Sequence, residues 1–249
     1  MKKENLVEFI NRFYLQGNLT KDSSGDWFPV KFKTNGKVTQ VLIKTSDKSV
    51  LIDVDANLDL PDGEFIIGNV KQLLSVLGAF GNEIELSLKQ DRQSFNNIMF
   101  LKDPNLEATI ALADPSTIED ETGLKSTPDC ELDFELKKEF IERFIRAKKA
   151  MNDALYFAIF PDDMNGSVDF IINYSQDTNT NNIKVTNKEI NLSQEFEPLL
   201  FNCNNFTAIL QENSDFRSAK ISVSGKGLMI ANFKGEDWES NYYLKAFQL

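Results

Sequence analysis

A short segment of this acidic chain concentrates positive charge. Residues 137–149 (KKEFIERFIRAKK) hold six basic and two acidic side chains, whereas the chain as a whole has a formal net charge of -11. At helical spacing the apolar residues of the segment gather on one face and most of its charged residues on the other. Such a face either binds the phosphates of a nucleic acid or is an ordinary solvated surface with i,i+4 ion pairs. The sequence leaves both interpretations open for Lys138, Arg143, Arg146 and Lys149.

Basic side chains are sparser on the other segments with helical spacing. Residues 1–16 contribute Arg12 together with Lys2 and Lys3 at the terminus, where chains fray, and residues 69–81 contribute Lys71. The segment 203–213 contributes no basic side chain. Because each neutralised phosphate adds affinity through counterion release, so few cations predict weak, sequence-independent contacts with DNA.

The residue types of the common enzyme sites are missing. The chain has no histidine, which excludes Ser-His-Asp and Cys-His catalysis and any His-ligated metal. It has neither a phosphate-binding G-x-x-x-x-G-K-[ST] loop nor a G-x-G-x-x-G turn. The two cysteines, Cys130 and Cys203, fit no metal or redox spacing. The sequence therefore predicts a protein that is not an enzyme and that uses no metal and no cofactor.

Two acidic motifs suggest metal ligands only at first sight. The stretch PDDMNGSV resembles a calcium loop, but Pro161 stands at the first ligand position and Ile172 at the place of the bidentate glutamate, which favours a hairpin turn. In the sequence DVD, strand alternation points Asp53 and Asp55 outward on either side of Val54.

The hydrophobic periodicity predicts a strand-rich α+β fold. Helices are expected at 1–16, at 69–81 with Asn69 as the N-cap, at 136–151 and at 203–213. Strands are expected at 27–34, 37–45, 48–56, 83–90, 96–103, 106–114, 130–136, 154–161, 167–175, 182–190, 196–202, 219–227, 228–235 and 241–249.

The order of these elements repeats. Residues 114–128, acidic and with two prolines, have the composition of a connector between a first domain, 1–113, and a second domain, 129–249. Each half runs helix, strands, helix, strands, with its two helices about 65 residues apart. This order predicts two copies of one architecture. The alternative is a single mixed sheet with four helices.

Three stretches resemble the DNA polymerase sliding clamps of tailed bacteriophages. They are ALADPSTI at 111–118, SGKGLMIANFKGEDWESNYYLKA at 224–246 and, more weakly, FIIGNVKQLLSVLGAF at 65–80. With the order of elements, the resemblance covers most of the chain. It implies a ring of three subunits, a homotrimer in which helices line a central hole and antiparallel sheets form the outer wall.

The resemblance also implies roles for particular residues. The segment 136–151 would be the first helix of the second domain, with its basic face toward duplex DNA. The residues implied to face DNA are Arg12, Lys71, Lys138, Arg143, Arg146 and Lys149. The resemblance further implies a pocket beneath the connector for a short hydrophobic motif of polymerase and other replication proteins, with Ile110, Leu112, Tyr243 and Phe247 as its walls.

The function implied is that of a processivity factor for DNA replication, a clamp that encircles duplex DNA and tethers the replicative polymerase. Its partners would be duplex DNA, DNA polymerase and a clamp loader, and its setting the cytoplasm of the infected bacterial host. The sequence shows no secretory signal and no apolar run long enough to span a membrane. Two alternatives stay open: a two-domain β-rich oligomeric virion or host-interaction protein with no nucleic-acid role, and a hydrolase with an unrecognised carboxylate site.

Overall fold

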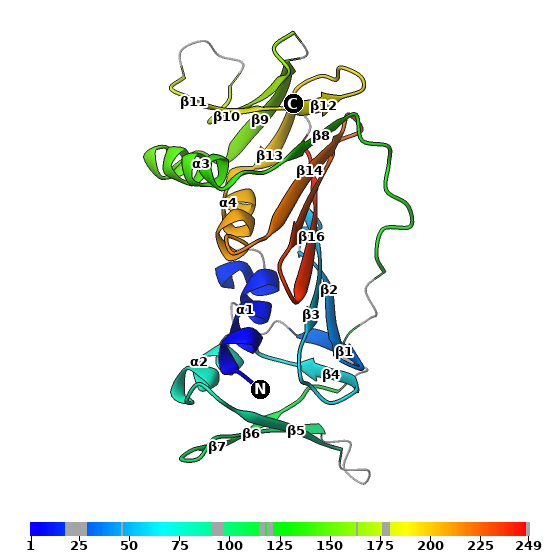
Figure 1. Cartoon of the computed structure of the whole chain (residues 1–249), viewed down its shortest axis with the longest axis vertical. Coiled ribbons are helices and arrows are strands. Elements are labelled where there is room, and N and C mark those ends of the chain that lie inside the picture. The colour runs from blue at the N-terminus through cyan, green and yellow to red at the C-terminus, as the bar shows by residue number, and fades with distance from the viewer. Residues whose placement is uncertain are drawn as a thin grey trace. The chain divides into compact units, whose positions relative to one another are not determined.

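The computed structural model describes residues 1–17, 29–45, 47–90, 97–114, 118, 122–162, 164–175 and 180–247 (Figure 1). The chain folds into two compact units. The first comprises Met1–Ser46, Ile52–Gly123 and Asp237–Glu239. The second comprises Asp47–Leu51, Leu124–Glu236 and Ser240–Leu249.

The first unit combines two α-helices with two antiparallel sheets. Its elements are α1 (Lys3–Tyr14), η1 (Leu15–Gly17), β1 (Val30–Asn35), β2 (Val38–Lys44), β3 (Val50–Asn57), β4 (Gly63–Ile67), α2 (Val70–Ala79), β5 (Glu85–Gln90), β6 (Asn97–Lys102) and β7 (Glu107–Ala111). The strands are neighbours in the orders β3-β2-β1-β4 and β5-β6-β7. Lys2 forms an isolated antiparallel bridge with Glu83, just before β5.

The second unit has the same plan with two additional strands. Its elements are β8 (Leu132–Glu135), α3 (Lys138–Ala150), β9 (Tyr156–Asp162), β10 (Ser167–Ile172), β11 (Ile183–Lys188), β12 (Ile190–Leu192), β13 (Leu199–Asn202), α4 (Cys203–Glu212), β14 (Ser218–Ser224), β15 (Leu228–Lys234) and most of β16 (Trp238–Lys245). The first two residues of β16, Trp238 and Glu239, belong to the first unit. The strand orders are β11-β10-β9-β13 and β12-β8-β14-β15-β16.

The strand orders confirm that one architecture occurs twice. The order β3-β2-β1-β4 corresponds to β11-β10-β9-β13, and β5-β6-β7 corresponds to β14-β15-β16. Strand β8 takes the place of the single bridge at Lys2, because it pairs with the first strand after the second helix of its unit. Strand β12 has no counterpart among the described residues of the first unit.

Phenylalanine fills the interior of both units. In the first, the helical spacing of α1 buries Phe9 and Phe13 against Phe32 of β1, with ring centroids 5.5–5.7 Å apart. In the second, Phe144 of α3 is fully buried, and its ring lies 5.1 Å from that of Phe206 and 5.2 Å from that of Phe157. Each buried aromatic side chain contributes roughly 1.5–3 kcal/mol of transfer free energy, so these helices are fixed by their apolar faces.

Two helices begin where asparagine caps them. The side chain of Asn69 accepts a hydrogen bond from the Gln72 amide (2.8 Å), and that of Asn202 accepts one from the Asn205 amide (3.0 Å). The cap at Asn69 is as the sequence predicts. Strand β4 is not predicted by the sequence, because its short continuous apolar run does not distinguish a strand from the start of the following helix.

Candidate functional site

Helix α3 turns its charged side chains outward because its apolar residues are buried. Phe140, Ile141, Phe144 and Ala147 form the buried face. Glu139 in the first turn and Lys149 in the last turn complement the helix dipole. Lys148 differs from its neighbour, since it is only 8% exposed and its Nζ donates to the carbonyl of Asn152 at 2.5 Å. Lys148 therefore stabilises the helix end instead of extending into solvent.

The four cations of α3 predicted to face DNA are all exposed. Arg146 lies 4.0 Å from Glu142, and both side chains are at least 70% exposed. The Nε of Arg143 donates to the carbonyl of Glu139 at 3.0 Å. The Nζ of Lys138 lies 5.8 Å from the ring centroid of Phe216. An exposed ion pair such as Arg146–Glu142 contributes only about 0–1 kcal/mol, so a phosphate can compete for the guanidinium.

Arg12 corrects the sequence prediction. Its residue is only 2% exposed, its guanidinium carbon lies 3.9 Å from the ring centroid of Trp238 in the same unit, and its Nη2 lies 3.8 Å from Glu8. A side chain enclosed in this way does not contact a phosphate, so the prediction that Arg12 faces DNA is wrong. The physical reason is that Trp238 covers the edge of α1 where helical spacing alone would place Arg12 at the surface. Lys71 of α2, by contrast, is exposed.

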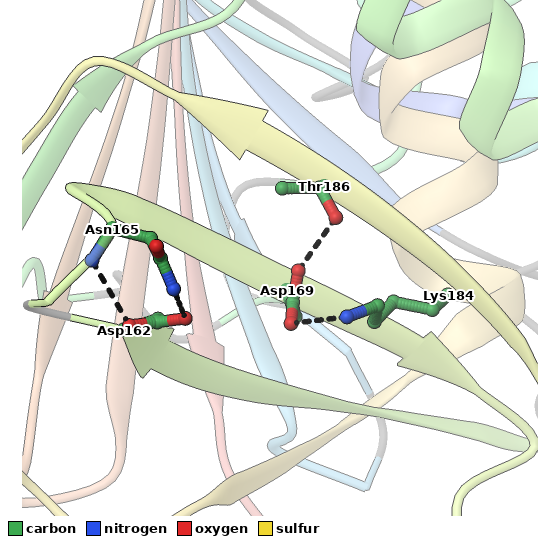
Figure 2. A network of polar contacts seen from close by, with 5 residues as sticks. All are labelled: Asp162, Asn165, Asp169, Lys184 and Thr186. Atoms are coloured by element: carbon green, nitrogen blue, oxygen red, sulfur yellow. Dashed lines mark hydrogen bonds and ion pairs between the residues drawn. The ribbon is translucent and has the colours of Figure 1, made fainter.

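The hairpin between β9 and β10 confirms the predicted turn. Figure 2 shows the carboxylate of Asp162 turned toward Asn165, whose amide nitrogen (3.1 Å) and Nδ2 (2.7 Å) both donate to it. The side-chain hydrogen bond lowers the pKa of Asp162. On the neighbouring strands Asp169 accepts hydrogen bonds from Lys184 Nζ (3.0 Å) and Thr186 Oγ1 (2.6 Å) (Figure 2). Both carboxylates are thus held by local donors.

Strand β3 carries two aspartates, Asp53 and Asp55, and in the described contacts neither is paired with a lysine as Asp169 is with Lys184. Val54 is fully buried, and Asp53 and Asp55 on either side of it are half-buried and turned to the other face, as strand alternation predicts. Gln40 Nε2 donates to Asp53 Oδ1 at 3.0 Å. Burial, followed by the charges of Asp53 and Glu239, raises the pKa of Asp55 to about 6. The carboxyl of Asp55 therefore stays protonated up to mildly acidic pH, near its raised pKa of about 6.

The two cysteines offer no reactive thiolate. Cys203 is fully buried, and this burial raises the pKa of its thiol to about 12. Burial also raises the pKa of Cys130, which is half-buried. Both thiols therefore stay protonated at neutral pH and are poor nucleophiles.

The last residue of β16 and the two residues after it join three separate segments of the second unit. The amide of Lys245 donates to the Ser49 carbonyl, that of Ala246 to the Gly227 carbonyl and that of Phe247 to the Leu200 carbonyl, each at 2.8 Å. The ring of Phe247 packs edge-on against Tyr156 at 4.8 Å. These bonds enclose an open pocket of about 930 Å³, called the C-terminal pocket below. It is lined by Asp47, Ser49, Pro198, Leu199, Gly225, Lys226, Gly227, Lys245, Ala246 and Phe247.

The G-K-G sequence in this pocket has a steric cause. A Cβ on Gly225 would lie 2.9 Å from the Cβ of Phe196, closer than carbon atoms approach. Gly227 has a φ of 90°, in the region that favours glycine. The two glycines form the turn between β14 and β15 and leave Lys226 exposed between them. The same motif in the sequence could have marked Lys226 as a pocket residue.

Of the four residues predicted for a partner pocket, Phe247 lines the C-terminal pocket. Tyr243 lies half-buried on β16 in the same unit and is not among the lining residues. Ile110 on β7 and Leu112 just beyond it belong to the first unit, where both are half-buried. The sequence analysis missed Pro198, Leu199 and Lys245 as pocket residues, because nothing in their spacing distinguishes them from ordinary strand residues.

Within the part of the chain that the structure describes, no helix is both long and apolar enough to cross a membrane.

Comparisons with family models and with curated proteins find no match to the sequence. The fold, however, is similar to the crystal structure of proliferating cellular nuclear antigen from Entamoeba histolytica, with a TM-score of 0.72 over 99% of this chain and 96% of that chain. The two sequences are 14% identical, so this likeness shows the fold alone. The chain has the α+β sliding-clamp fold with two repeated domains, as the sequence predicts.

Proposed function

We propose that this chain, which has the sliding-clamp fold, encircles duplex DNA as a homotrimeric ring and tethers the replicative DNA polymerase, conferring processivity. It acts as a non-enzymatic factor that a clamp loader places on DNA. The resemblance to clamps of tailed bacteriophages supports a role in the cytoplasm of an infected bacterial host. Residues 114–128 serve as the connector between the two domains.

The observation that carries this proposal is the exposed basic face of α3. Lys138, Arg143, Arg146 and Lys149 are all exposed on one helix of a protein with a net charge of -11. Local potential decides attraction at contact distances, because salt screens charges beyond about 8–10 Å. The acidic remainder repels DNA elsewhere, so the polyanion is directed to this face.

The small number of cations suits a protein that slides. Each exposed contact with a phosphate contributes about 0–1 kcal/mol at ordinary salt, so thermal motion moves the DNA relative to the helix. Retention then depends on closure of the ring rather than on contact energy. Lys71 on α2 adds one further exposed cation to the proposed DNA-facing set.

A second part of the proposal concerns the partner site. We assign the docking of a short hydrophobic motif of polymerase to the C-terminal pocket, with Phe247 in its wall. Ile110, Leu112 and Tyr243 remain proposed contributors on the basis of the resemblance. The half-buried ring of Phe247 and the side chains of Pro198 and Leu199 supply the apolar surface that such a motif requires.

Topological retention on DNA tests the proposal. The protein is mixed with a nicked circular plasmid in a crowded solution, and the DNA is then separated from free protein at moderate salt. A sliding clamp stays on the circle and is lost when a restriction enzyme cuts it. Sedimentation should give the mass of three chains. A virion or host-interaction protein would show equal retention on circle and line, which would refute the proposal.

A further inference from the structure

Two hairpins of the chain contain the sequence Asn-Gly, one in each unit. Asn35 ends β1 and is followed by Gly36 in the turn to β2, and Asn165 and Gly166 lie in the turn between β9 and β10. In such a sequence the main-chain nitrogen of the glycine can attack the asparagine side-chain carbonyl, because glycine has no side chain to hinder the approach. Neither turn has a role in the proposed function.

The reaction of an Asn-Gly sequence is deamidation, and its only co-reactant is water. The glycine nitrogen, after losing its proton to hydroxide, forms a bond to the asparagine Cγ. The bond from Cγ to Nδ2 then breaks, and water returns a proton to the departing nitrogen, which leaves as ammonia. Water opens the resulting cyclic imide at either carbonyl, which gives aspartate or isoaspartate. Both products add a negative charge, and isoaspartate also lengthens the main chain by one carbon.

The side chain of Asn165 is held by Asp162 (Figure 2). Its Nδ2 donates to Asp162 Oδ2 at 2.7 Å, and its main-chain amide donates to Asp162 Oδ1 at 3.1 Å. Attack by the Gly166 nitrogen displaces Nδ2 and must therefore break the first of these bonds. A hydrogen bond to a charged group is stronger than a neutral one, so this contact raises the barrier to deamidation of Asn165.

The side chain of Asn35 lacks such a contact. Within the part of the chain that the structure describes, it takes part in no hydrogen bond and no ion pair. Burial does not distinguish the two sites, because both asparagines are exposed and Met164, just before Asn165, is 97% exposed. The two sites therefore differ in what holds the asparagine and not in access to water.

The charges beside the two glycines have opposite signs. Lys37 directly follows Gly36 and is exposed, whereas the carboxylate of Asp162 borders the turn that contains Gly166. A neighbouring cation favours the deprotonated amide that attacks Cγ, and a neighbouring anion disfavours it. Charge and hydrogen bonding thus act in the same direction.

We infer that Asn35 is a site of spontaneous deamidation and that Asp162 protects Asn165 from the same reaction. The inference concerns the chain's own chemistry and does not depend on the proposed binding of DNA or polymerase.

Deamidation of Asn35 changes its surroundings in two ways. The new carboxylate enters an open pocket of about 490 Å³ that Asp55 and Glu64 also line, so it adds a third acid there. Isoaspartate at this position also disturbs the pairing of Asn35 with Val38, which closes the β1–β2 hairpin. The modified chain should therefore melt at a lower temperature than the fresh one.

Peptide mapping of the whole folded chain tests the inference. The protein is incubated at mildly alkaline pH, sampled over time and digested at acidic pH, where deamidation is slow. Mass spectrometry then reads the mass gained when a carboxyl replaces each amide. Asn35 should convert about tenfold faster than Asn165, since loss of a charge-assisted hydrogen bond opposes only the second reaction. Equal rates, faster conversion of Asn165 or no conversion of Asn35 would overturn the inference.

Variants separate the two causes. Asp162→Ala should raise the rate at Asn165 about tenfold and leave that at Asn35 unchanged, so Asn35 serves as an internal reference. Lys37→Glu should slow the reaction at Asn35 alone. The matched control is Lys89→Glu, a charge reversal at an exposed lysine on β5, outside both hairpins, which should change neither rate.

Three results would overturn the protective role of Asp162. One is an unchanged rate at Asn165 in Asp162→Ala. Another is a rise at both asparagines in that variant, because global unfolding and not a local contact would then explain it. The third comes from the unmodified chain unfolded in urea, where the contact with Asp162 is absent and the difference between the two asparagines should largely disappear. A difference as large as in the folded chain would assign it to the local sequence alone.

Discussion

The helices α1 and α3 occupy equivalent places in the two repeats, and each contains an arginine paired with a glutamate one turn earlier. In α1 the pair is Arg12–Glu8, with 3% of the arginine side chain exposed. In α3 it is Arg146–Glu142, with 72% exposed. The two pairs have the same spacing and nearly the same separation, 3.8 and 4.0 Å. The difference lies in what covers the arginine.

This difference teaches that a basic residue's role follows from its tertiary neighbours. Trp238 covers Arg12, where the aromatic face and the adjacent carboxylate offset the desolvation of the guanidinium. No described side chain encloses Arg146, which stays available to a ligand. Pairs of the same residue types and spacing thus serve once in packing, in α1, and once at a surface, in α3.

The largest expected effect on stability comes from substitutions in the hydrophobic cores against which α1 and α3 pack. Phe144→Ala in α3 should destabilise the protein by about 3–5 kcal/mol, because it removes a fully buried ring and leaves a cavity. Phe13→Ala in α1 should cost a similar amount, since that ring is also fully buried. Urea denaturation followed by circular dichroism measures both. The control is Phe100→Ala on β6, where the ring is 36% exposed. A loss below 1 kcal/mol for Phe144→Ala would contradict the packing described.

The second largest effect tests the difference between the two arginines directly, by comparing the stability lost when each is replaced by alanine. Arg12→Ala should lower the free energy of unfolding by about 2 kcal/mol, because it removes the contact with Trp238 and the partly buried pair with Glu8. Arg146→Ala should change it by less than about 0.5 kcal/mol, as expected for an exposed pair. Equal losses for the two variants would show that coverage by Trp238 has no energetic weight.

Reversing the charge of exposed side chains on α3 tests whether this helix contacts DNA. Arg146→Glu with Lys149→Glu should reduce retention on nicked circular DNA, and stimulation of the cognate polymerase, about tenfold at low salt. Assembly and thermal stability should be unchanged because both side chains are exposed. Lys37→Glu in the first unit serves as the charge-matched control. Unchanged stimulation and retention would mean that this face of α3 does not meet DNA.

The smallest effect compares carboxylates of the two units. The pKa of Asp55 is raised by burial from 3.8 to about 6, so its folded form keeps a proton that the unfolded form releases in that pH window. Asp55 therefore costs stability as pH rises through the window, and the full cost applies above about pH 6. Because the group is partly exposed, solvent screening limits the cost to about 1 kcal/mol. Asp55→Asn should raise Tm at pH 8 and have no effect below pH 3.8.

The pKa of Asp162 in the second unit is shifted in the opposite direction from that of Asp55, so its effect on stability has the opposite sign. The hydrogen bond from the Asn165 side chain lowers its pKa, so its contribution to stability is present at neutral pH and is lost as pH falls through the folded pKa. Asp162→Asn should therefore lower Tm at pH 8. If both substitutions shifted Tm in the same direction at pH 8, the assigned environments of the two carboxylates would be wrong.

Local sequence patterns predicted the helices of both repeats, most of their strands and the orientation of α3. The spacing of Phe140 and Phe144 buries one face of that helix, and the charged residues must then face outward. Asn69 predicted the start of α2, because its side chain is of a type that caps helix N-termini. These features depend on neighbours within one or two turns, so the sequence contains them.

What the sequence could not predict depends on residues far apart in the chain. Arg12 is buried by Trp238, and no local pattern links the two. Hydrogen bonds from residues 245–247, at the C-terminal pocket, join Ser49, Leu200 and Gly227, which lie far apart in the chain. Helical periodicity and strand alternation describe faces of single elements, and they contain no information about which distant element covers each face.

The hydrogen bonds donated by the amides of residues 245–247, at the end of β16, have a consequence for the order of folding during translation. Residues 245–247 leave the ribosome after Ser49, Leu200 and Gly227, the residues whose carbonyls they bond. Domains fold progressively during translation, at about 5–20 residues per second, so the β9–β10 hairpin forms before these amides emerge. The C-terminal pocket is therefore completed only when this stretch has been translated. A nascent chain with both helices of its second unit already folded therefore lacks the finished pocket, and the proposed docking of a partner would have to wait until Phe247 has been translated.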